Sequence, residues 1–162
     1  MTWPHVDPSA VPAPPRTDHF VLEPLRPEHA ESDHVAWMSS IDHIRSTPGF
    51  GDGAWGPDSW PYEMSLDDNR RDLEMHWDEF QRGVAFAFTV LDPTDGDVIG
   101  CVYVDPDDGP LPEGDARGDV MVRSWTRASH AEIDGVLVDA VDRWLHDSWP
   151  VTQVRWPGRH RP

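Results

Sequence analysis

The pattern of apolar and polar positions along the chain predicts helices and strands in a mixed order. The clearest helical periodicity covers residues 65–83 and 129–149, where apolar side chains recur at intervals of three and four. A further helix is predicted over residues 28–45 from apolar residues at three-residue spacing. Its stripe consists of Val35, Met38, Ile41 and Ile44. The stripe of the last helix consists of Ile133, Val136, Leu137, Ala140, Val141, Trp144 and Leu145.

Local signals mark the ends of the helix predicted over residues 65–83. Ser65 is a favourable N-cap, and Asp68 follows it three residues later, as in a capping box. Gly83 is the residue type that ends helices in a left-handed conformation. Both ends of this helix are therefore predicted by side-chain chemistry as well as by periodicity.

Short runs of β-branched and aromatic residues predict the strands. The runs cover residues 19–27, 84–106, 116–127 and 151–156, and the second contains two strands joined at the turn "DPTDGD". The order strand, two helices, three strands, helix, strand predicts an α/β fold, a mixed α+β sheet with helices on its faces. We expect a flexible proline-rich arm over residues 1–18 and a single domain over 19–162.

Composition narrows the classes of partner. The formal net charge is −17, which disfavours nucleic acid and anionic lipid and favours a cationic small molecule. A general role of the charge in solubility is the competing explanation. Cys101 is the only cysteine, so no disulfide framework is expected. With no signal peptide or membrane-length apolar run in the sequence, we expect a cytoplasmic protein.

Three stretches resemble the GNAT superfamily of acetyl-CoA-dependent N-acetyltransferases. "FVLEPLRPEHA" is similar to the family's first strand and its turn into the first helix, and "FTVLDPTDGDVIGCVYV" to its central hairpin. "GDVMVRSWTRASHAEIDGVLVDAVDRWL" resembles the fourth strand and the long helix after it. The resemblance covers residues 19–156 and implies a GNAT fold in which the family's final helix and strand are missing.

The resemblance also implies a site for acetyl-CoA. In the family, an Arg/Gln-x-x-Gly-x-Gly/Ala loop before the long helix receives the pyrophosphate at a helix N-terminus. Arg127 matches the first position, whereas His130 and Glu132 stand where the glycines would be. The residues that the resemblance assigns to the cofactor are Met121, Val122, Arg123, Arg127, Ala128, Ser129, His130, Ala131 and Glu132.

The departure from the glycine pattern has its own structural interpretation. Ser129 and Glu132 have the spacing of a capping box, in which each side chain binds the backbone N–H of the other residue. A capped helix end leaves fewer donors for a phosphate, and the carboxylate of Glu132 adds repulsion. Arg123 and Arg127 act in the opposite direction. The sequence leaves both outcomes open, weakened cofactor binding and its loss.

Three residues are candidates for the catalytic group that moves protons. Tyr103 shares a strand face with Cys101, while Glu63 and Asp119 flank segments expected at the acceptor side. Each has an ordinary alternative, as a strand aromatic or a solvated carboxylate, and Cys101 is expected to be a small buried residue. The histidine spacing contains no pair suited to zinc on one helix face, so no metal site is expected.

These observations favour transfer of an acyl group from acetyl-CoA to a small, cationic amine, with residues 46–64 as a wall of the acceptor site. The alternative is a non-catalytic GNAT-like ligand-binding or interaction module that has lost cofactor binding. Without the family's final strand, the strand over residues 151–156 would be an exposed edge, which predicts a homodimer.

Overall fold

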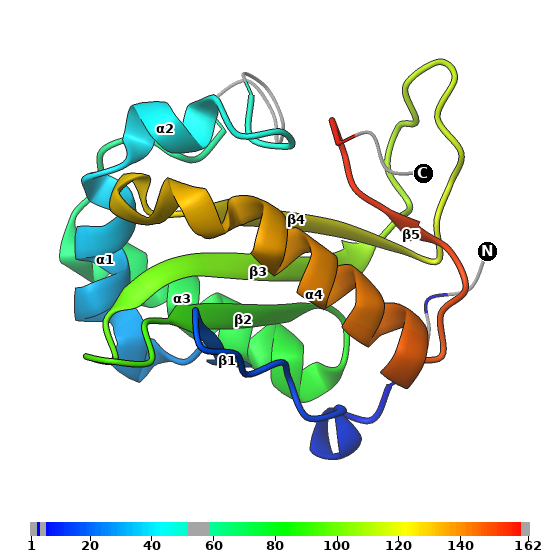
Figure 1. The fold of residues 1–162 in the computed structure, drawn as a ribbon, viewed down its shortest axis with the longest axis horizontal. Helices are drawn as coiled ribbons and strands as arrows, with labels where there is room; N and C mark the ends of the chain where they lie inside the picture. Colours follow the sequence, from blue (N-terminus) through cyan, green and yellow to red (C-terminus); the bar gives the residue numbers. More distant parts are fainter. Residues whose placement is uncertain (1–2, 4–5, 52–58, 160–162) are drawn as a thin grey trace.

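The computed structural model describes residues 3, 6–51 and 59–159, and Figure 1 shows their arrangement around one sheet. The strands are β1 (Val21–Pro24), β2 (Phe86–Leu91), β3 (Val98–Pro106), β4 (Val120–Thr126) and β5 (Val154–Arg155). They lie in the order β1-β2-β3-β4-β5, with antiparallel pairs except for the parallel pair β4–β5. The expected mixed α+β sheet is therefore confirmed.

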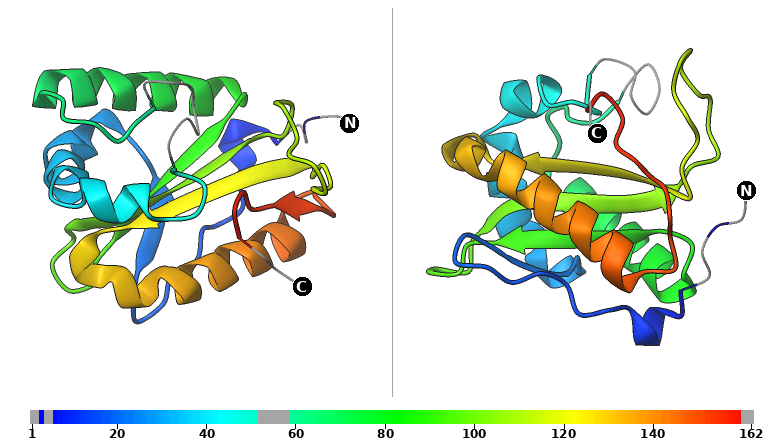
Figure 2. Two further views of the ribbon diagram at one scale, coloured as in Figure 1. Left: turned by 90° about the horizontal axis from the view of Figure 1, so that it is seen from above. Right: turned by 45° about the vertical axis from the view of Figure 1, so that its right-hand side comes forward.

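The helices are α1 (Ala30–Met38), α2 (Ile41–Arg45), α3 (Leu66–Arg82) and α4 (Asp134–Ser148). Figure 2 shows α3 on one face of the sheet and α4 on the other. The α4 side holds a core in which Leu137, Val141 and Leu145 pack against even-numbered strand residues such as Val122. The other side holds a second core, where Trp37 and Leu73 lie against β3 and β4.

The ends predicted for α3 are those that the structure has. Ser65 accepts a hydrogen bond from the N–H of Asp68, and Gly83 follows the helix with a φ of 68°. A side chain is excluded at Gly100 in β3 for another reason, because a Cβ atom there would lie 2.5 Å from the carbonyl oxygen of Trp125. This glycine lets β3 approach β4 closely beside the irregularity in the register of Val90 and Leu91.

The helix predicted over residues 28–45 is divided into α1 and α2 by a turn at Ser39 and Ser40. Strict three-residue spacing drifts around a helix, so one straight helix cannot bury all four apolar residues of that stripe. Ile44 is buried, whereas Val35 is 56% exposed. In α4, Val136 departs from the predicted stripe in the same way and is exposed.

The proline-rich N-terminal segment packs against the domain. Trp3 stacks on Phe86 and donates its indole N–H to the carbonyl oxygen of Gly83. Val6 and Val11 also pack against the core on the α4 side. The apolar residues between the prolines therefore hold the described part of this arm in place.

The last strand is shorter than the sequence predicts. β5 pairs with β4 only at Val120–Val154 and Met121–Arg155, and the two strands pair no further. A homodimer through the outer edge of β5 stays a prediction. No helix in the described part of the chain is both long and apolar enough to span a membrane.

Candidate functional site

A cavity of 540 Å³ lies between α3 and the sheet on the side of α1. α3 supplies one wall, β3 contributes Tyr103 and Asp105, and Trp37 and Trp60 add aromatic surface. No arginine is present among the described residues that line it, and the lining is rich in carboxyl groups. The carboxyl groups belong to Asp33, Asp72, Glu79, Asp105 and Asp108.

Two of these carboxyl groups titrate unusually high because they are buried. Burial raises the pKa of Asp105 to about 6, although the nearby positive charge of Arg123 lowers it in part. Burial also raises the pKa of Asp33 to about 6, against the effect of the hydrogen bond from Asn69. A carboxyl group with such a pKa exchanges its proton close to neutral pH, as a general base must.

Tyr103 lines the cavity and is hydrogen-bonded to the buried Trp125. Its hydroxyl oxygen accepts a hydrogen bond of 3.0 Å from the indole N–H of Trp125, and its ring lies 5.6 Å from that of His76. Burial raises the pKa of Tyr103 well above its usual value, so the phenol keeps its proton. Burial lowers the pKa of His76 to about 4, so the imidazole is neutral at physiological pH.

The other two candidate catalytic residues lie elsewhere. Asp119 accepts hydrogen bonds from the N–H groups of Thr152 and Gln153 and from the hydroxyl of Thr152, and these bonds lower its pKa. Its carboxylate holds the segment that leads into β5. Glu63 is exposed and lines a different hollow, beside α2 and Ala128. Of the three candidates, Tyr103 alone lines the acidic cavity.

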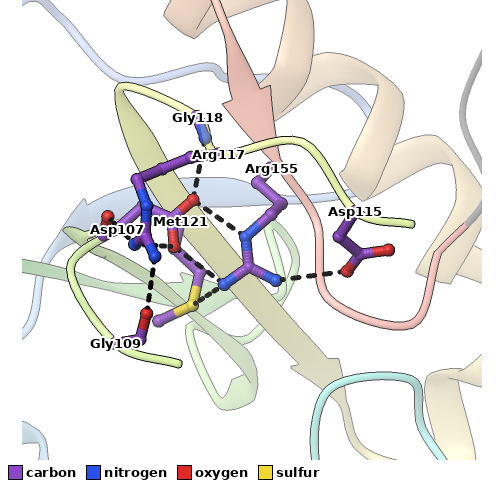
Figure 3. A network of polar contacts seen from close by, with 7 residues as sticks. All are labelled: Asp107, Gly109, Asp115, Arg117, Gly118, Met121 and Arg155. Carbon is purple, nitrogen blue, oxygen red and sulfur yellow. Dashed lines mark hydrogen bonds and ion pairs between the residues drawn. The ribbon is translucent and has the colours of Figure 1, made fainter. Parts of the chain in front are cut away.

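A network of polar contacts holds β5 against the loop after β3 (Figure 3). Asp107 accepts two hydrogen bonds of 2.8 Å from Arg155 and one from the N–H of Gly118. Arg117 lies on the same carboxylate, and Arg155 also reaches Asp115 and the sulfur of Met121. The network fixes the place at which β4 and β5 begin to diverge.

The capping box predicted for Ser129 and Glu132 does not form at the start of α4, so this prediction is wrong. Ser129 binds the ring Nδ1 of His130 at 2.8 Å, and no side chain caps this end. Residues Ala128–Ile133 form a 3-10 helix in which His130 has non-helical angles, so the regular helix begins only at Asp134. Ser129 is therefore not at an N-cap position, and Glu132 is exposed.

The C-terminal segment runs alongside β4 where the strands diverge. Arg159 makes two hydrogen bonds to Asp134, of 2.8 and 3.0 Å, and a longer one of 3.4 Å to the carbonyl oxygen of Ser124. Arg123 donates to the carbonyl oxygen of Gly49, which also lies near Pro157. The loop over residues 46–64 thus meets the C-terminal segment over β4, although its residues 52–58 lie outside the described part of the chain.

Comparison with solved structures places the fold. A putative ribosomal-protein-serine acetyltransferase from Vibrio cholerae aligns with a TM-score of 0.61 at 11% identity, over 87% of this chain and 71% of that protein. The microcin C7 self-immunity acetyltransferase MccE, in complex with acetyl-CoA and AMP, aligns with a TM-score of 0.60 at 13% identity, over 85% and 67%. A putative GNAT-family acetyltransferase from Bordetella pertussis aligns with a TM-score of 0.50 at 16% identity, over 83% of this chain and 72% of that protein.

The chain has the GNAT acetyltransferase fold. Part of each neighbour has no counterpart in this chain. No family model matches the sequence, and no curated protein matches it. At these identities the structural likeness concerns the fold alone.

In the GNAT fold the cofactor is expected at the turn from β4 into α4 and along the edge of β4. Arg127 and Arg159 lie near that turn, and their positive charges suit a pyrophosphate. The N–H of Ala128 is already bound to the hydroxyl of Ser40, so the turn offers one donor fewer. The Arg159 side chain, bound to Asp134 and to the carbonyl oxygen of Ser124, also lies on the edge of β4, where the extended arm of coenzyme A would be expected.

The residues that the sequence did not reveal as site residues line the acidic cavity of this chain. Asp105 lies two residues after Tyr103 on β3, so the alternation that placed Tyr103 also places Asp105 on the same face. On α3, Asp72, His76 and Glu79 follow the buried edge of the helix at helical spacing. The sequence contains the strand alternation and the helical spacing, but it does not show that the carboxyl groups are buried.

Proposed function

We propose that this protein transfers an acyl group from acyl-coenzyme A to a small cationic amine, with the cavity beside α3 as the acceptor site. The observation that carries the proposal is the cavity's lining, which combines five carboxyl groups with aromatic rings and no arginine among its described residues. Such a lining attracts organic cations through charge and through the faces of the rings. The GNAT fold and the acidic surface support the same conclusion.

The chemistry requires a base from this chain. The cofactor supplies an activated acyl thioester when bound. An amine enters as an ammonium ion. As its nitrogen bonds to the acyl carbon and the carbon–sulfur bond breaks, the nitrogen gives up one proton and the leaving thiolate takes one up. Another proton, which the ammonium must lose before its nitrogen can attack, needs a base in the cavity. Asp105 is placed to receive that proton, because its raised pKa and its position on β3 make it a base inside the cavity.

Tyr103 and Met121 would position the acceptor beside β4. Tyr103 keeps its phenolic proton, and the hydroxyl interacts with Cys101 and accepts the indole N–H of Trp125, so its ring is held in place beside the acceptor. Met121 lines the cavity and also pairs with Arg155 at the point where β5 leaves β4. The acceptor cavity thus reaches the place where the family's cofactor arm is expected.

A second candidate function is a non-catalytic module that binds the cation without transferring anything to it. Two sets of hydrogen bonds favour this alternative, because they occupy groups that a cofactor would use. Arg159 binds Ser124 and Asp134, and Ser40 binds the N–H of Ala128. In this case the cavity would serve recognition alone.

An assay of thiol release separates the two. Purified protein is mixed with acetyl-CoA and a panel of small amines, and free coenzyme A is measured. We expect release with cationic amines, and we expect Asp105→Asn to lower kcat by about a hundredfold or more. Asp115→Asn is the matched control, since Asp115 lies outside the cavity and is partly exposed.

Calorimetric titration of acetyl-CoA completes the test. Arg159→Ala removes the side chain that lies on the β4 edge, and Ser40→Ala frees the N–H of Ala128. Binding by the wild type or by either variant, together with thiol release, supports the enzyme. Absence of binding and of release in all three proteins rejects it in favour of the module.

A further inference from the structure

The acidic cavity is elongated along α3. The helix residues that line it include Asn69, Asp72, His76 and Glu79, which lie on one face of the helix at successive turns. Asp72 and Glu79 are seven residues apart, which places them two turns and about 10 Å from each other along the axis. The carboxyl groups are therefore spread along the cavity and not gathered at one point.

One acidic end is formed by Asp33 and Asp72. The side chain of Asp33 is buried and accepts a hydrogen bond of 3.1 Å from the amide of Asn69, which also accepts the indole N–H of Trp37. The negative charge of Asp72 acts on Asp33, so the two carboxyl groups belong to the same end. Trp37 and its neighbour Trp60 provide ring surface beside them, with centroids 5.4 Å apart.

The other acidic end is formed by Asp105, Glu79 and Asp108. The charges of Glu79 and Asp108 act on Asp105. Asp105 is half-buried and lines the cavity, and the positive charge of Arg123 acts on its carboxyl group. Arg123 brings one positive charge to the three carboxyl groups of this end, and a ligand cation would offset the excess of negative charge.

The surface between the two ends carries no charge at physiological pH. It comprises the neutral imidazole of His76, the ring of Tyr103 and the side chains of Leu73 and Ala85. A methylene chain packs well against such a surface, whereas a second charge at the middle would find no partner. The cavity thus has the order acidic, apolar, acidic.

We propose that this cavity binds a linear organic dication, with one ammonium group at each acidic end and an alkyl chain over His76 and Tyr103. The proposal rests on the proposed function in naming such a dication as the acyl acceptor. Binding itself needs no cofactor, so it is measured separately from acyl transfer.

The test is calorimetric titration near neutral pH without coenzyme A, with three probes. Diaminooctane carries two ammonium groups on a chain of suitable length, octylamine carries one on the same chain, and diaminobutane carries two that are too close. We expect diaminooctane to bind at least about tenfold more tightly than either of the others. Glu79→Gln should reduce its affinity to that of octylamine, and Asp72→Asn should do the same.

Glu74→Gln is the matched control, because Glu74 lies on α3 but is exposed and outside the cavity. It removes the same charge and should leave all three affinities within about twofold of the wild type. Circular dichroism of each variant shows whether α3 is retained. If Glu79→Gln and Asp72→Asn both unfold, the comparison of the three probes on the wild type decides alone.

Equal affinity for diaminooctane and octylamine overturns the proposal, and so does an equal loss in Glu74→Gln and Glu79→Gln. Absence of binding by all three probes overturns it as well. Dication binding without thiol release supports this inference while the enzyme fails. Thiol release with monoamines, and no preference for dications, supports the enzyme while this inference fails.

Discussion

Arg155 binds both carboxylate oxygens of Asp107, with its Nε and one terminal nitrogen each 2.8 Å from an oxygen. The carboxylate is fully buried, and the guanidinium is 11% exposed. This pair connects β5, which has only two residues in the sheet, to the loop that follows β3 (Figure 3). The short strand is therefore held in place by side chains more than by its backbone ladder.

Asp107→Asn is expected to lower the free energy of unfolding by about 3 kcal/mol, because the largely buried guanidinium of Arg155 loses its buried charge partner and keeps only the outer contact with Asp115. Urea titration followed by tryptophan fluorescence measures the change. Asp115→Asn removes the outer, partly exposed contact of Arg155 and should cost less than about 1 kcal/mol. Equal losses in the two variants would contradict the role given to the buried pair.

The same pair makes the stability of the fold depend on pH in the acid range. Burial would raise the pKa of Asp107, but the hydrogen bonds from Arg155 and from the N–H of Gly118 outweigh it and lower the pKa. The contribution is present above the pKa of the unfolded chain and is lost as the pH falls through the lower, folded value. Asp107→Asn should therefore show a smaller loss of stability between about pH 5 and about pH 2 than the wild type. Parallel acid titrations would contradict this.

Tyr103→Phe should destabilise the fold by about 1–2 kcal/mol, because the buried indole N–H of Trp125 loses its acceptor. Thermal unfolding of the variant measures the loss. Tyr62→Phe is a suitable control, since Tyr62 is exposed. Unchanged stability of Tyr103→Phe would show that Trp125 finds another acceptor.

Asp105→Asn should stabilise the protein while it removes activity. The folded state favours the protonated form of Asp105, whose pKa is raised to about 6, so its charge costs stability at neutral pH. The variant removes that cost, and we expect a gain of about 1–2 kcal/mol near pH 7 that fades as the pH falls toward about 3, below the pKa of both states. Chemical denaturation at the two pH values gives the comparison, and a loss of stability near pH 7 would contradict the conclusion that burial outweighs the attraction of Arg123.

The affinity for organic cations should rise between about pH 5 and about pH 7, because the carboxylate forms of Asp33 and Asp105 bind the ligand. Calorimetry of diaminooctane across this range measures it, and in Asp105→Asn the rise should become smaller. An affinity independent of pH would count against these two groups as ligands. The charged groups that face the pair from neighbouring elements are His34, Asp72, Glu79, Asp108 and Arg123.

The parts of the fold that the sequence predicts are those with local signals. Ser65 and Gly83 bound α3 because a cap and a left-handed residue act within one turn, and the Asp-Gly turn sets the hairpin of β2 and β3. The capping box at Ser129 failed because a 3-10 helix precedes α4 and moves the true helix start to Asp134. Ala128, the first residue of that 3-10 helix, donates its N–H to the hydroxyl of Ser40, and a contact so far away in the sequence has no local signal.

The candidate site was predictable only in part. Tyr103 lies in the cavity, as its strand alternation allows, and Asp119 proved to be bound by backbone groups of the segment before β5. Asp105 and Asp33 have no distinctive sequence signal, since their raised pKa values come from burial between α1, α3 and the sheet. Burial of a single carboxyl group is a property of the packed domain, and no local pattern encodes it.

The spacing of Asp72 and Glu79 on one face of α3 would determine the length of the ligand that the cavity prefers. Each turn of the helix advances by about 5 Å, so the carboxylate at the far end sets the ligand length in steps of that size. Moving that charge back by one turn, with Glu79→Gln combined with His76→Glu, would shorten the preferred diamine by about four methylene groups. Selectivity in such a cavity could be changed by exchanging single residues along one helix, with the sheet left untouched.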